Sequence, residues 1–263
     1  MKRFSWWFSI MLIGLAVIAS FVGPWCIEED PLAQNLDQAL KAPSLEHPFG
    51  TDHLGRSVLS RLVHGTRHSL ILAAVCVGLS VCLGTIAGLT AGLFPGFIDN
   101  VIMRLVDGLM AFPGTLLAIV LAGTLGSGSS GLVLALVLSS WCDYCRLVRN
   151  IVRSTLNKPY MEAGRLLGFD RFFLTRRYLL GQITPHLFTL ASLGMGRTIL
   201  NVSSLGFLGI GLRPPTPEWG AMITQGLPYL SEASYLVLFP GAAIFGTVLS
   251  FQIIAGFSKV HSQ

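Results

Sequence analysis

Two kinds of side chain in this sequence have the spacing of metal or redox sites. Cys142 and Cys145 form a C-x-x-C pair within "WCDYCR". Paired thiols at this spacing could bind a metal or carry redox chemistry. The same spacing also occurs where small, polarizable side chains pack inside a helix. Because no second ligand pair stands at a suitable spacing, we favour packing.

The second group consists of the histidines His47, His53, His64 and His68. His64 and His68 are four residues apart and could share a helix face, which makes a metal site one hypothesis. No carboxylate or thiol joins them at ligand spacing, so isolated, solvated histidines are favoured. We also find no nucleophile–base arrangement. The sequence therefore predicts a protein that is not itself an enzyme, with no catalytic residue, no cofactor and no metal ligand of its own.

Nucleotide-binding motifs are the remaining candidates for chemistry. "GSGSSG" (126–131) fits G-x-G-x-x-G, but that motif requires a preceding strand and a following helix, and apolar runs surround it here. The P-loop requires glycine directly before lysine. No lysine of this chain follows a glycine: they are Lys2, Lys41, Lys158 and Lys259. If ATP drives this protein, another polypeptide must bind it.

The composition predicts the elements that must position any site. The chain has 263 residues, 52% hydrophobic and 12% charged, whereas a soluble domain carries about 25% charged residues. Asp, Glu, Lys and Arg are absent from residues 4–27, 69–98 and 108–142. A membrane helix needs roughly 20 apolar residues. The first two runs therefore fit one span each. The third fits two spans joined by the turn "GTLGSGSSG" (123–131).

Two more apolar runs, one of them interrupted by Arg197, complete a prediction of six transmembrane helices. The predicted fold is an all-α membrane protein in which residues 1–263 form a single transmembrane domain. The expected spans are residues 4–25, 69–92, 101–124, 131–149, 184–211 and 235–257.

The distribution of charge predicts the orientation. The net charge of +5 is not a nucleic-acid signal, because the basic residues crowd into 146–182 and flank the first and last spans. The acidic "EED" (28–30) instead follows the first span. Short basic loops stay in the cytoplasm. We therefore expect both termini and residues 146–182 on the cytoplasmic side, and residues 26–66 and 213–234 outside.

The N-terminal apolar run has a second interpretation. A charged start followed by an apolar core is typical of a signal peptide. This run is longer than a usual signal-peptide core, and no clear small-x-small cleavage site ends it. An uncleaved first span is the favoured interpretation.

Glycines mark a contact face on the second span. Gly84, Gly88 and Gly92 recur at four-residue intervals, which places them on one side of a helix. Small residues there let another helix approach closely. The sequence predicts packing at this face, either within the chain or against a partner.

Three other residues stand out within the spans. Pro113 is expected to kink the third span. Asp107, close to Arg104, is interpreted as a charge at the boundary of the same span. Arg197 is the one basic residue well inside a predicted span. Such residues are costly and usually face a cavity or a partner, so Arg197 either lines a pore or snorkels to the membrane surface.

Residues 158–182 form a charged, glycine-punctuated segment between two apolar runs. Pro159 is tolerated in the first turn of a helix, and "YMEAGRLL" continues it. Gly168 suits a helix end with positive φ, and Asp170 can cap a second helix, "RFFLTRRYLL". The resulting helix–turn–helix exposes phenylalanines among arginines, which favours a docking surface. A helix lying on the membrane surface is the alternative, but it gives no reason for the glycine at the break.

At this segment the sequence resembles a known family. "EAGRLLG" (162–168) is similar to the EAA loop of bacterial ABC importer permeases, roughly E-A-A-x-x-x-G followed by a second short helix. Glu162, Ala163 and Gly168 match, Gly164 replaces the second alanine, and Gly181 stands where the family often has proline. The resemblance implies that this loop sits in a groove of an ATPase subunit and transmits its closure to the membrane helices. The coupling residues it implies are Glu162, Ala163, Gly164, Gly168, Phe172 and Arg176.

Two further motifs extend the resemblance. "HPFGTDHLGRSVLSRLVHGTRHSL" (47–70) resembles the segment before span 2 of permeases for dipeptides, oligopeptides and nickel. "FLGIGLRPPTPEWGAMI" (207–223) resembles their outer loop after span 5. The likeness covers about residues 47 to 250. It implies a type I ABC importer permease in the bacterial inner membrane. The implied partners are a second, homologous permease, two ATPase subunits that bind ATP and Mg, an extracytoplasmic substrate-binding protein and the lipid bilayer, with no nucleic acid.

The resemblance also bears on the substrate. Peptide permeases of this group often have a glutamate in span 5 where this chain has Val202, and nickel permeases are more similar there. Nickel permeases also tend to carry a polar or basic side chain near the position of Arg197. Nickel, or a related metal, carried free or as a chelate is therefore expected, with di- or oligopeptides as the alternative. Arg197 is the residue expected on the translocation path.

A self-contained secondary transporter or channel is the competing class. It predicts ionisable groups along the spans and internal inverted repeats. Only Arg197, and to a lesser degree Asp107 and Asp143, meet the first condition, and no repeat is visible in the sequence. A permease that works with a separate ATPase is the favoured hypothesis.

Overall fold

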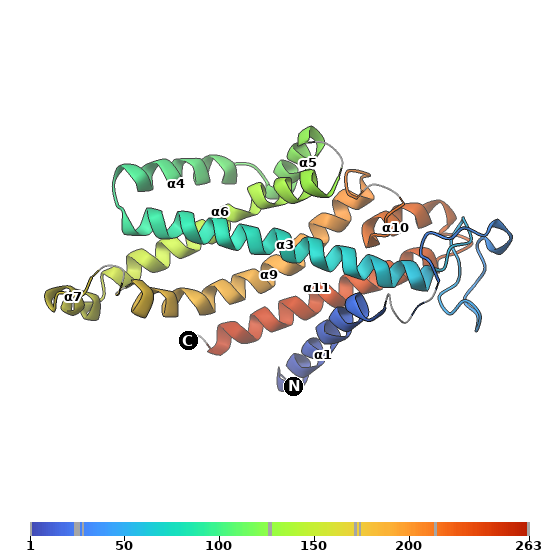
Figure 1. The fold of residues 1–263 in the computed structure, drawn as a ribbon, viewed down its shortest axis with the longest axis horizontal. Coiled ribbons are helices and arrows are strands. Elements are labelled where there is room, and N and C mark those ends of the chain that lie inside the picture. Colours follow the sequence, from blue (N-terminus) through green and yellow to red (C-terminus); the bar gives the residue numbers. More distant parts are fainter. Residues whose placement is uncertain are drawn as a thin grey trace.

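The computed structural model describes residues 2–23, 27, 29–125, 128–170, 173, 175–212 and 215–261. Those residues are helical or irregular, and they contain no strand beyond a bridge between Thr51 and Ser57. Long helices lie side by side along the longest axis of the molecule (Figure 1). The short helix α7 (Pro159–Leu166) projects at one end, and residues 29–57 gather at the other.

The central pair of helices is α3 (Val58–Leu93) and α6 (Ser129–Leu156). The side chain of Ser57 caps α3 by accepting from the backbone N–H of Ser60. At 1.5 Å per residue, α3 is about 54 Å long, well beyond the predicted span of 69–92. The first turns of α3 lie beside residues 29–57, at one end of the molecule (Figure 1).

The glycine face of α3 packs within the chain. A β-carbon added to Gly84 would lie 2.6 Å from the carbonyl oxygen of Trp141, and one added to Gly88 would lie 2.6 Å from that of Cys145. Gly92 faces Val152 in the same way. These contacts confirm the predicted packing face, and they identify α6 as its partner.

The predicted third span is two helices. α4 (Phe97–Met110) and α5 (Gly114–Leu125) are bent by 90° relative to each other, and Pro113 lies in the break between them. The kink was expected, but its size turns one predicted span (101–124) into a broken pair. Proline lacks an N–H, and its ring clashes with the preceding turn, which favours a break at this point.

After α6, the chain forms α7, a π-helical turn η2 (Thr175–Leu179) and α9 (Leu180–Phe207). The predicted second helix, "RFFLTRRYLL" (171–180), is described over Phe173 and residues 175–180, where it is a π-helical turn continuous with α9. η2 runs directly into α9, and Pro185 lies inside α9. The proposed cap at Asp170 concerns residues 171–174, of which only Phe173 is described.

The remaining helices close the bundle. α10 (Trp219–Gly226) and the turn η3 (Leu227–Tyr229) lie beside residues 29–57, and α11 (Tyr235–His261) packs against α9. α1 (Lys2–Phe21) lies against α11 and α3, on the opposite side of the molecule from α4 (Figure 1). A buried cluster joins these elements through Leu70, Ile199, Trp219, Leu236 and Val248.

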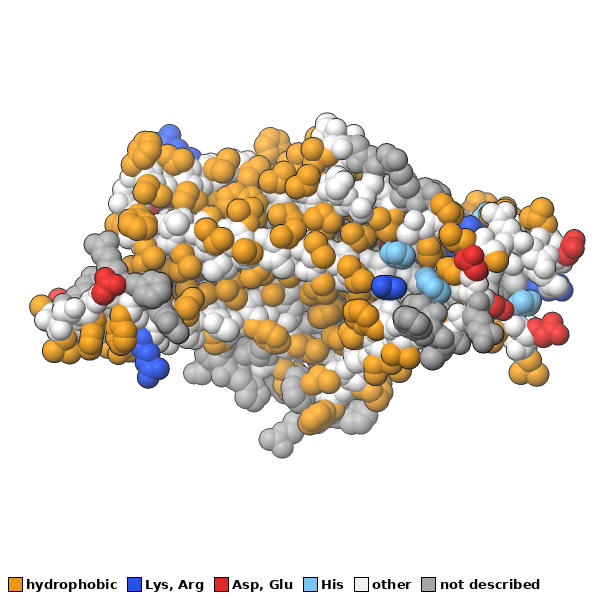
Figure 2. Space-filling view, in the orientation of Figure 1, with side chains coloured by type: hydrophobic (Ala, Val, Ile, Leu, Met, Phe, Trp, Pro, Cys, Tyr) orange, Lys and Arg blue, Asp and Glu red, His pale blue; other side chains and the backbone are white. Residues whose placement is uncertain are grey.

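Within the described residues, three helices are long and apolar enough to cross a membrane: Val58–Leu93, Ser129–Leu156 and Tyr235–Phe257. The bent pair α4–α5 makes a fourth if it counts as one span. Within the described side chains, α1 contributes the shorter apolar stretch Trp7–Ile18, and α9 is long enough but too polar. The expectation of six spans is therefore met only in part. On the visible face, hydrophobic side chains cover the middle of the molecule, and most charged ones lie toward its two ends (Figure 2).

One charged cluster fastens residues 29–57 to α3 and α10. The Asp52 carboxylate accepts from Arg56 Nε at 2.7 Å and also from Arg61, while both arginines donate to Gln225 Oε1. Burial opposes ionisation of Asp52. The Arg61 charge, the backbone N–H of Arg56 and the Arg56 charge outweigh it, so the pKa of Asp52 lies below its ordinary value of 3.8. Sequence reasoning missed this cluster, because Gln225 lies far from it along the chain.

We expect Asp52→Asn to loosen this end of the molecule. Removing the carboxylate leaves two buried arginines without their anionic partner, at a cost of about 3–5 kcal/mol. Because the folded-state pKa is depressed, the Asp52 contribution is complete above pH 3.8 and is lost as the pH falls through the folded-state value. Hydrogen exchange of residues 33–56 should accelerate in the variant. Asp37→Asn, at an exposed residue of the same segment, should leave the exchange unchanged, and equal effects of the two would contradict the role of the cluster.

Candidate functional site

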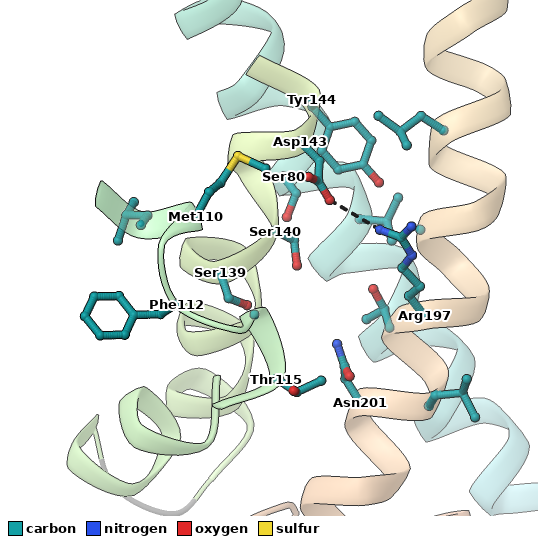
Figure 3. Close-up of a pocket in the computed structure, with 17 residues that line it drawn as sticks. Ser80, Met110, Phe112, Thr115, Ser139, Ser140, Asp143, Tyr144, Arg197 and Asn201 are labelled. Carbon is teal, nitrogen blue, oxygen red and sulfur yellow. Dashed lines mark hydrogen bonds and ion pairs between the residues drawn. The ribbon is translucent and has the colours of Figure 1, made fainter. Parts of the chain in front are cut away.

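A hollow of about 410 Å³ opens between α3, α6, α9 and the break between α4 and α5. Figure 3 shows side chains from α6 and α9 reaching into it from opposite sides. Its lining is rich in polar side chains: Ser80, Thr115, Ser139, Ser140, Asp143, Tyr144, Arg197, Thr198 and Asn201. α9 contributes Arg197, Thr198 and Asn201 to this lining.

Arg197 and Asp143 form an ion pair at the hollow. Arg197 Nη1 lies 3.3 Å from Asp143 Oδ2, and the two side chains point toward each other from α9 and α6 (Figure 3). Both remain accessible, with 68% of the Arg197 side chain and 43% of the Asp143 side chain exposed. Arg197 therefore lines a hollow of the folded chain.

The polar lining of the hollow can form weak, exchangeable contacts with a molecule that enters it. One positive and one negative charge are offered beside several hydroxyl groups and the amide of Asn201. Within the part of the chain that the structure describes, no three His, Cys, Asp or Glu side chains gather where they could hold a metal ion. The chemistry of the lining is hydrogen bonding and exchangeable ion pairing.

The cysteine and histidine candidates lie elsewhere. Cys142 and Cys145 are both buried and pack with Val106 and Trp141, as the favoured interpretation predicted. The His53 ring stacks on Tyr229 at 5.4 Å between ring centroids, and burial lowers its pKa. His64 Nδ1 lies 2.9 Å from the carbonyl oxygen of Ser60.

The second candidate region is α7, at the end of the molecule opposite residues 29–57 (Figure 1). Pro159 is its first residue, as predicted. Gly168 has a φ of +81°, and the N–H of Phe169 donates to the carbonyl of Gly164, which closes the helix in the manner of a glycine C-cap. The predicted turn at Gly168 is thus confirmed.

α7 has one packed side and one free side. Met161 and Gly164 are buried, whereas Glu162 and Ala163 are exposed. The free side continues into an apolar tip whose side chains are strongly exposed: Leu166 at 84%, Leu167 at 74%, and the paired rings of Phe169 and Phe173. Phe172 lies outside the described residues, and of Arg176 only the backbone is described. The exposed apolar tip on a small projecting helix is a surface suited to docking.

α4 is fastened to α6 by ion pairs that sequence reasoning missed. Asp99, in the first turn of α4, accepts from Arg149 and Arg153, and Asp107 accepts from Arg146 Nη2 at 2.5 Å. Asp107 therefore pairs across helices and not with its neighbour Arg104 on the same helix. The regular spacing of the arginines on α6 was visible in the sequence, but their acidic partners lie about 40 to 54 residues away.

The motif at 207–223 has a structural explanation. Glu218 is fully buried and caps α10 by accepting from the N–H groups of Gly220 and Ala221 at 2.9 and 3.0 Å. Burial raises the pKa of Glu218. Any side chain at Gly206 would collide with this carboxylate, and any at Gly220 would collide with the carbonyl of Ser203. The glycines therefore allow α10 to lie directly on the end of α9.

Comparisons with known proteins agree with this architecture. The sequence profile described as "Binding-protein-dependent transport system inner membrane component" matches residues 84–259. The chain is 35% identical over 260 residues to the nickel transport system permease protein NikC of Escherichia coli (strain K12), covering 99% of this chain and 94% of that protein.

Two other relatives are named for different substrates. The glutathione transport system permease protein GsiD of Pectobacterium atrosepticum is 36% identical over 247 residues, covering 94% of this chain and 81% of the relative. The di/tripeptide transport system permease protein DppC of Pseudomonas aeruginosa is 36% identical over 251 residues, covering 93% and 83%. The fold is similar to that of a chain of the inward-facing MetNI methionine ABC transporter, with a TM-score of 0.62, 18% identity, and 77% and 96% of the two chains covered.

Proposed function

This chain belongs to the family of binding-protein-dependent transport system inner membrane components, and from that premise we propose that it carries nickel, or a related metal, as the free ion or as a chelate. Its relatives are permease subunits of nickel, glutathione and peptide transport systems. It is thus a multi-pass membrane permease of an ABC importer, whose ATP-hydrolysing and substrate-binding functions belong to partner subunits. The subunit itself is proposed to have no catalytic activity and to bind no cofactor.

The proposed topology has six membrane crossings in the bacterial inner membrane, with both termini in the cytoplasm. α1 and α9 are counted as crossings besides α3, the bent pair α4–α5, α6 and α11. The crowding of basic residues into 146–182 supports a cytoplasmic position for α7. Residues 29–57, which begin with the acidic Glu29 and Asp30, then face outward, because they lie at the opposite end of the molecule (Figure 1).

The proposed partners are a second, homologous permease, two ATPase subunits and an extracytoplasmic substrate-binding protein. The exposed tip of α7 is the proposed contact with an ATPase, which would bind ATP and Mg in its own site. The proposed coupling loop includes Glu162, Ala163, Gly164, Gly168, Phe172 and Arg176. ATP can drive transport only if it favours one state of the complex over the other, and a loop held between the ATPase and the bundle passes that preference to the membrane helices.

The hollow beside Arg197 is the proposed section of the translocation path. A path must bind its cargo weakly enough to release it, as ion channels do. The accessible Arg197–Asp143 pair and the surrounding hydroxyls meet this condition, because each offers an exchangeable contact. High-affinity selection of the cargo would then be the task of the substrate-binding protein.

The match to a nickel permease over nearly the full length of both chains carries the proposal for nickel. The second observation is Val202, at a position where peptide permeases often have a glutamate. Di- or oligopeptide transport is the second candidate, because relatives named for glutathione and di/tripeptide transport are equally similar in sequence.

We expect a reconstituted importer to take up labelled nickel in an ATP-dependent manner. The complete complex, with both permeases, both ATPases and the binding protein, would be placed in liposomes and supplied with nickel alone or with nickel and a histidine chelator. Uptake should be saturable and should resist competition by excess dipeptide or glutathione. The control replaces internal ATP with a non-hydrolysable analogue.

Two results would contradict the proposal at different levels. Uptake of labelled peptide without uptake of nickel would replace the metal by the peptide candidate and keep the permease function. Transport by the purified chain alone, without ATP or partners, would overturn the permease function itself in favour of a self-contained transporter.

A further inference from the structure

α4 is held by two buried residues, one apolar and one charged. Among the 14 residues of α4, Asp99 and Val106 are buried, and Asp99 is only 4% exposed. Val106 packs with Trp141, Cys142 and Cys145 of α6. The remaining surface of α4 is largely open, so the carboxylate is a principal attachment of this helix.

The Asp99 carboxylate forms ion pairs with two arginines of α6. Arg149 donates to both oxygens, Nε to Oδ1 at 2.5 Å and Nη2 to Oδ2 at 2.8 Å. Arg153 Nη2 donates to Oδ2 at 2.7 Å. A two-pronged bond between guanidinium and carboxylate fixes direction as well as distance. The buried acid and its two partners therefore fix where α4 begins relative to α6.

The location of this attachment links two functional regions. Arg153 stands in the last turn of α6, and α7 begins at Pro159. The other end of α4 reaches the hollow, because Met110 and the residues of the break line it. A 14-residue helix is about 21 Å long. α4 thus spans from the base of the projecting helix to the rim of the hollow.

The other helices of the bundle are joined differently. α3 and α6 lie in close contact at Gly84, Gly88 and Gly92, where even an added β-carbon would collide with α6. The second tie between α4 and α6, Asp107 with Arg146, is open to solvent, with 65% and 42% of the side chains exposed. Exposed ion pairs contribute little. Asp99 is therefore the buried polar tie between the start of α4 and the end of α6, beside the apolar contacts of Val106.

We propose that Asp99 is a positioning residue that makes the α4–α5 break, and with it the rim of the hollow, follow the movement of α7. The inference rests on the proposed function, because α7 moves only if an ATPase acts on it. The Arg149–Asp99–Arg153 contacts carry the displacement of the end of α6 to the start of α4. α4 then carries it to Met110 and Thr115 at the hollow.

The test uses the complete reconstituted importer with Asp99→Asn. Asparagine has nearly the same shape but loses the charge that both arginines bind. We expect uptake per ATP hydrolysed to fall about fivefold or more, the size of a typical coupling free energy, while ATP hydrolysis continues. Asp107→Asn is the matched control, on the same helix and also paired to α6, and should keep the wild-type ratio.

A structural readout separates coupling from general damage. Spin labels at the exposed residues Leu105 of α4 and Ser154 of α6 report whether the two helices move together. In the wild type the distance between the labels should be the same with and without bound ATP. In Asp99→Asn it should change or broaden on ATP binding. An unchanged distance in the variant would overturn the proposal.

Other outcomes are equally decisive. An unchanged ratio of uptake to ATP hydrolysis in Asp99→Asn, or an equal loss in Asp107→Asn, would overturn the inference. If Asp99→Asn does not assemble, Arg149→Lys decides, because it keeps the charge and removes the two-pronged bond. A wild-type ratio in that variant would also overturn it. Failure of the wild-type complex to transport would contradict the proposed function, which is a separate result.

Discussion

Replacing Gly168 by valine is expected to abolish most of the coupling between ATP hydrolysis and uptake. Gly168 has a φ of +81°, a region that costs an ordinary L-residue about 1–2 kcal/mol and a β-branched residue more. A penalty of this size reduces the population of the native turn by about tenfold or more. The turn positions the exposed tip of α7, so uptake should fall by a similar factor.

The surroundings of Gly168 make this substitution informative. A β-carbon added there meets nothing within 4 Å, so any effect arises from the backbone and not from a collision. Gly168→Asn is the matched control, because asparagine adopts positive φ far more readily than valine. The measurement is uptake and ATP hydrolysis by the reconstituted complex. Equal, wild-type activity of both variants would show that the conformation at Gly168 is not needed for coupling.

Glu162 offers a companion test on the helix itself. Its side chain is exposed on the free side of α7, so Glu162→Ala removes no buried contact of the chain. A loss of uptake with continued ATP hydrolysis would therefore locate the effect at the ATPase contact. Wild-type uptake in both Glu162→Ala and Gly168→Val, with normal assembly, would exclude α7 as the coupling element.

The second large effect is expected at Gly88. A β-carbon there would lie 2.6 Å from the carbonyl oxygen of Cys145 and 2.8 Å from Cβ of Val148, so valine would force α3 and α6 apart. Overpacking costs about 1–3 kcal/mol, and more where the obstacle is backbone that cannot turn aside. We expect Gly88→Val to lower the thermal unfolding temperature in detergent by several degrees or to prevent accumulation of the folded protein.

The control for Gly88 lies on the same helix. Gly78 is also in α3, but a β-carbon added there meets nothing within 4 Å. Gly78→Val carries the same intrinsic change in helix propensity without the collision. A similar destabilisation by both variants would show that the close approach of α3 to α6 contributes little to the stability of the fold.

Features that depend on a few neighbouring residues could be predicted from the sequence. The apolar runs predicted a helical membrane protein, the four-residue glycine spacing predicted a contact face, and Pro113 predicted a kink. Gly168 predicted a turn, because positive φ is a local property of the backbone. The family resemblance was carried by equally local motifs. Each of these conclusions rests on interactions within one or two helical turns.

Features that depend on how helices meet were decided by the tertiary structure. Arg197 and Asp143 are 54 residues apart, Asp99 and Arg149 are 50 apart, and Arg61 and Gln225 are 164 apart. The periodicity of the sequence does not predict which acidic side chain forms an ion pair with which arginine. The size of the bend between α4 and α5, 90°, could not be predicted from Pro113 alone, and the sequence did not indicate that polar residues of α9 line a hollow. The long helices and the turn at Gly168 could be predicted from the sequence, because backbone conformation depends largely on neighbouring residues. Only the packed bundle decided which charges meet and where a polar hollow opens, because those contacts join residues that are distant along the chain.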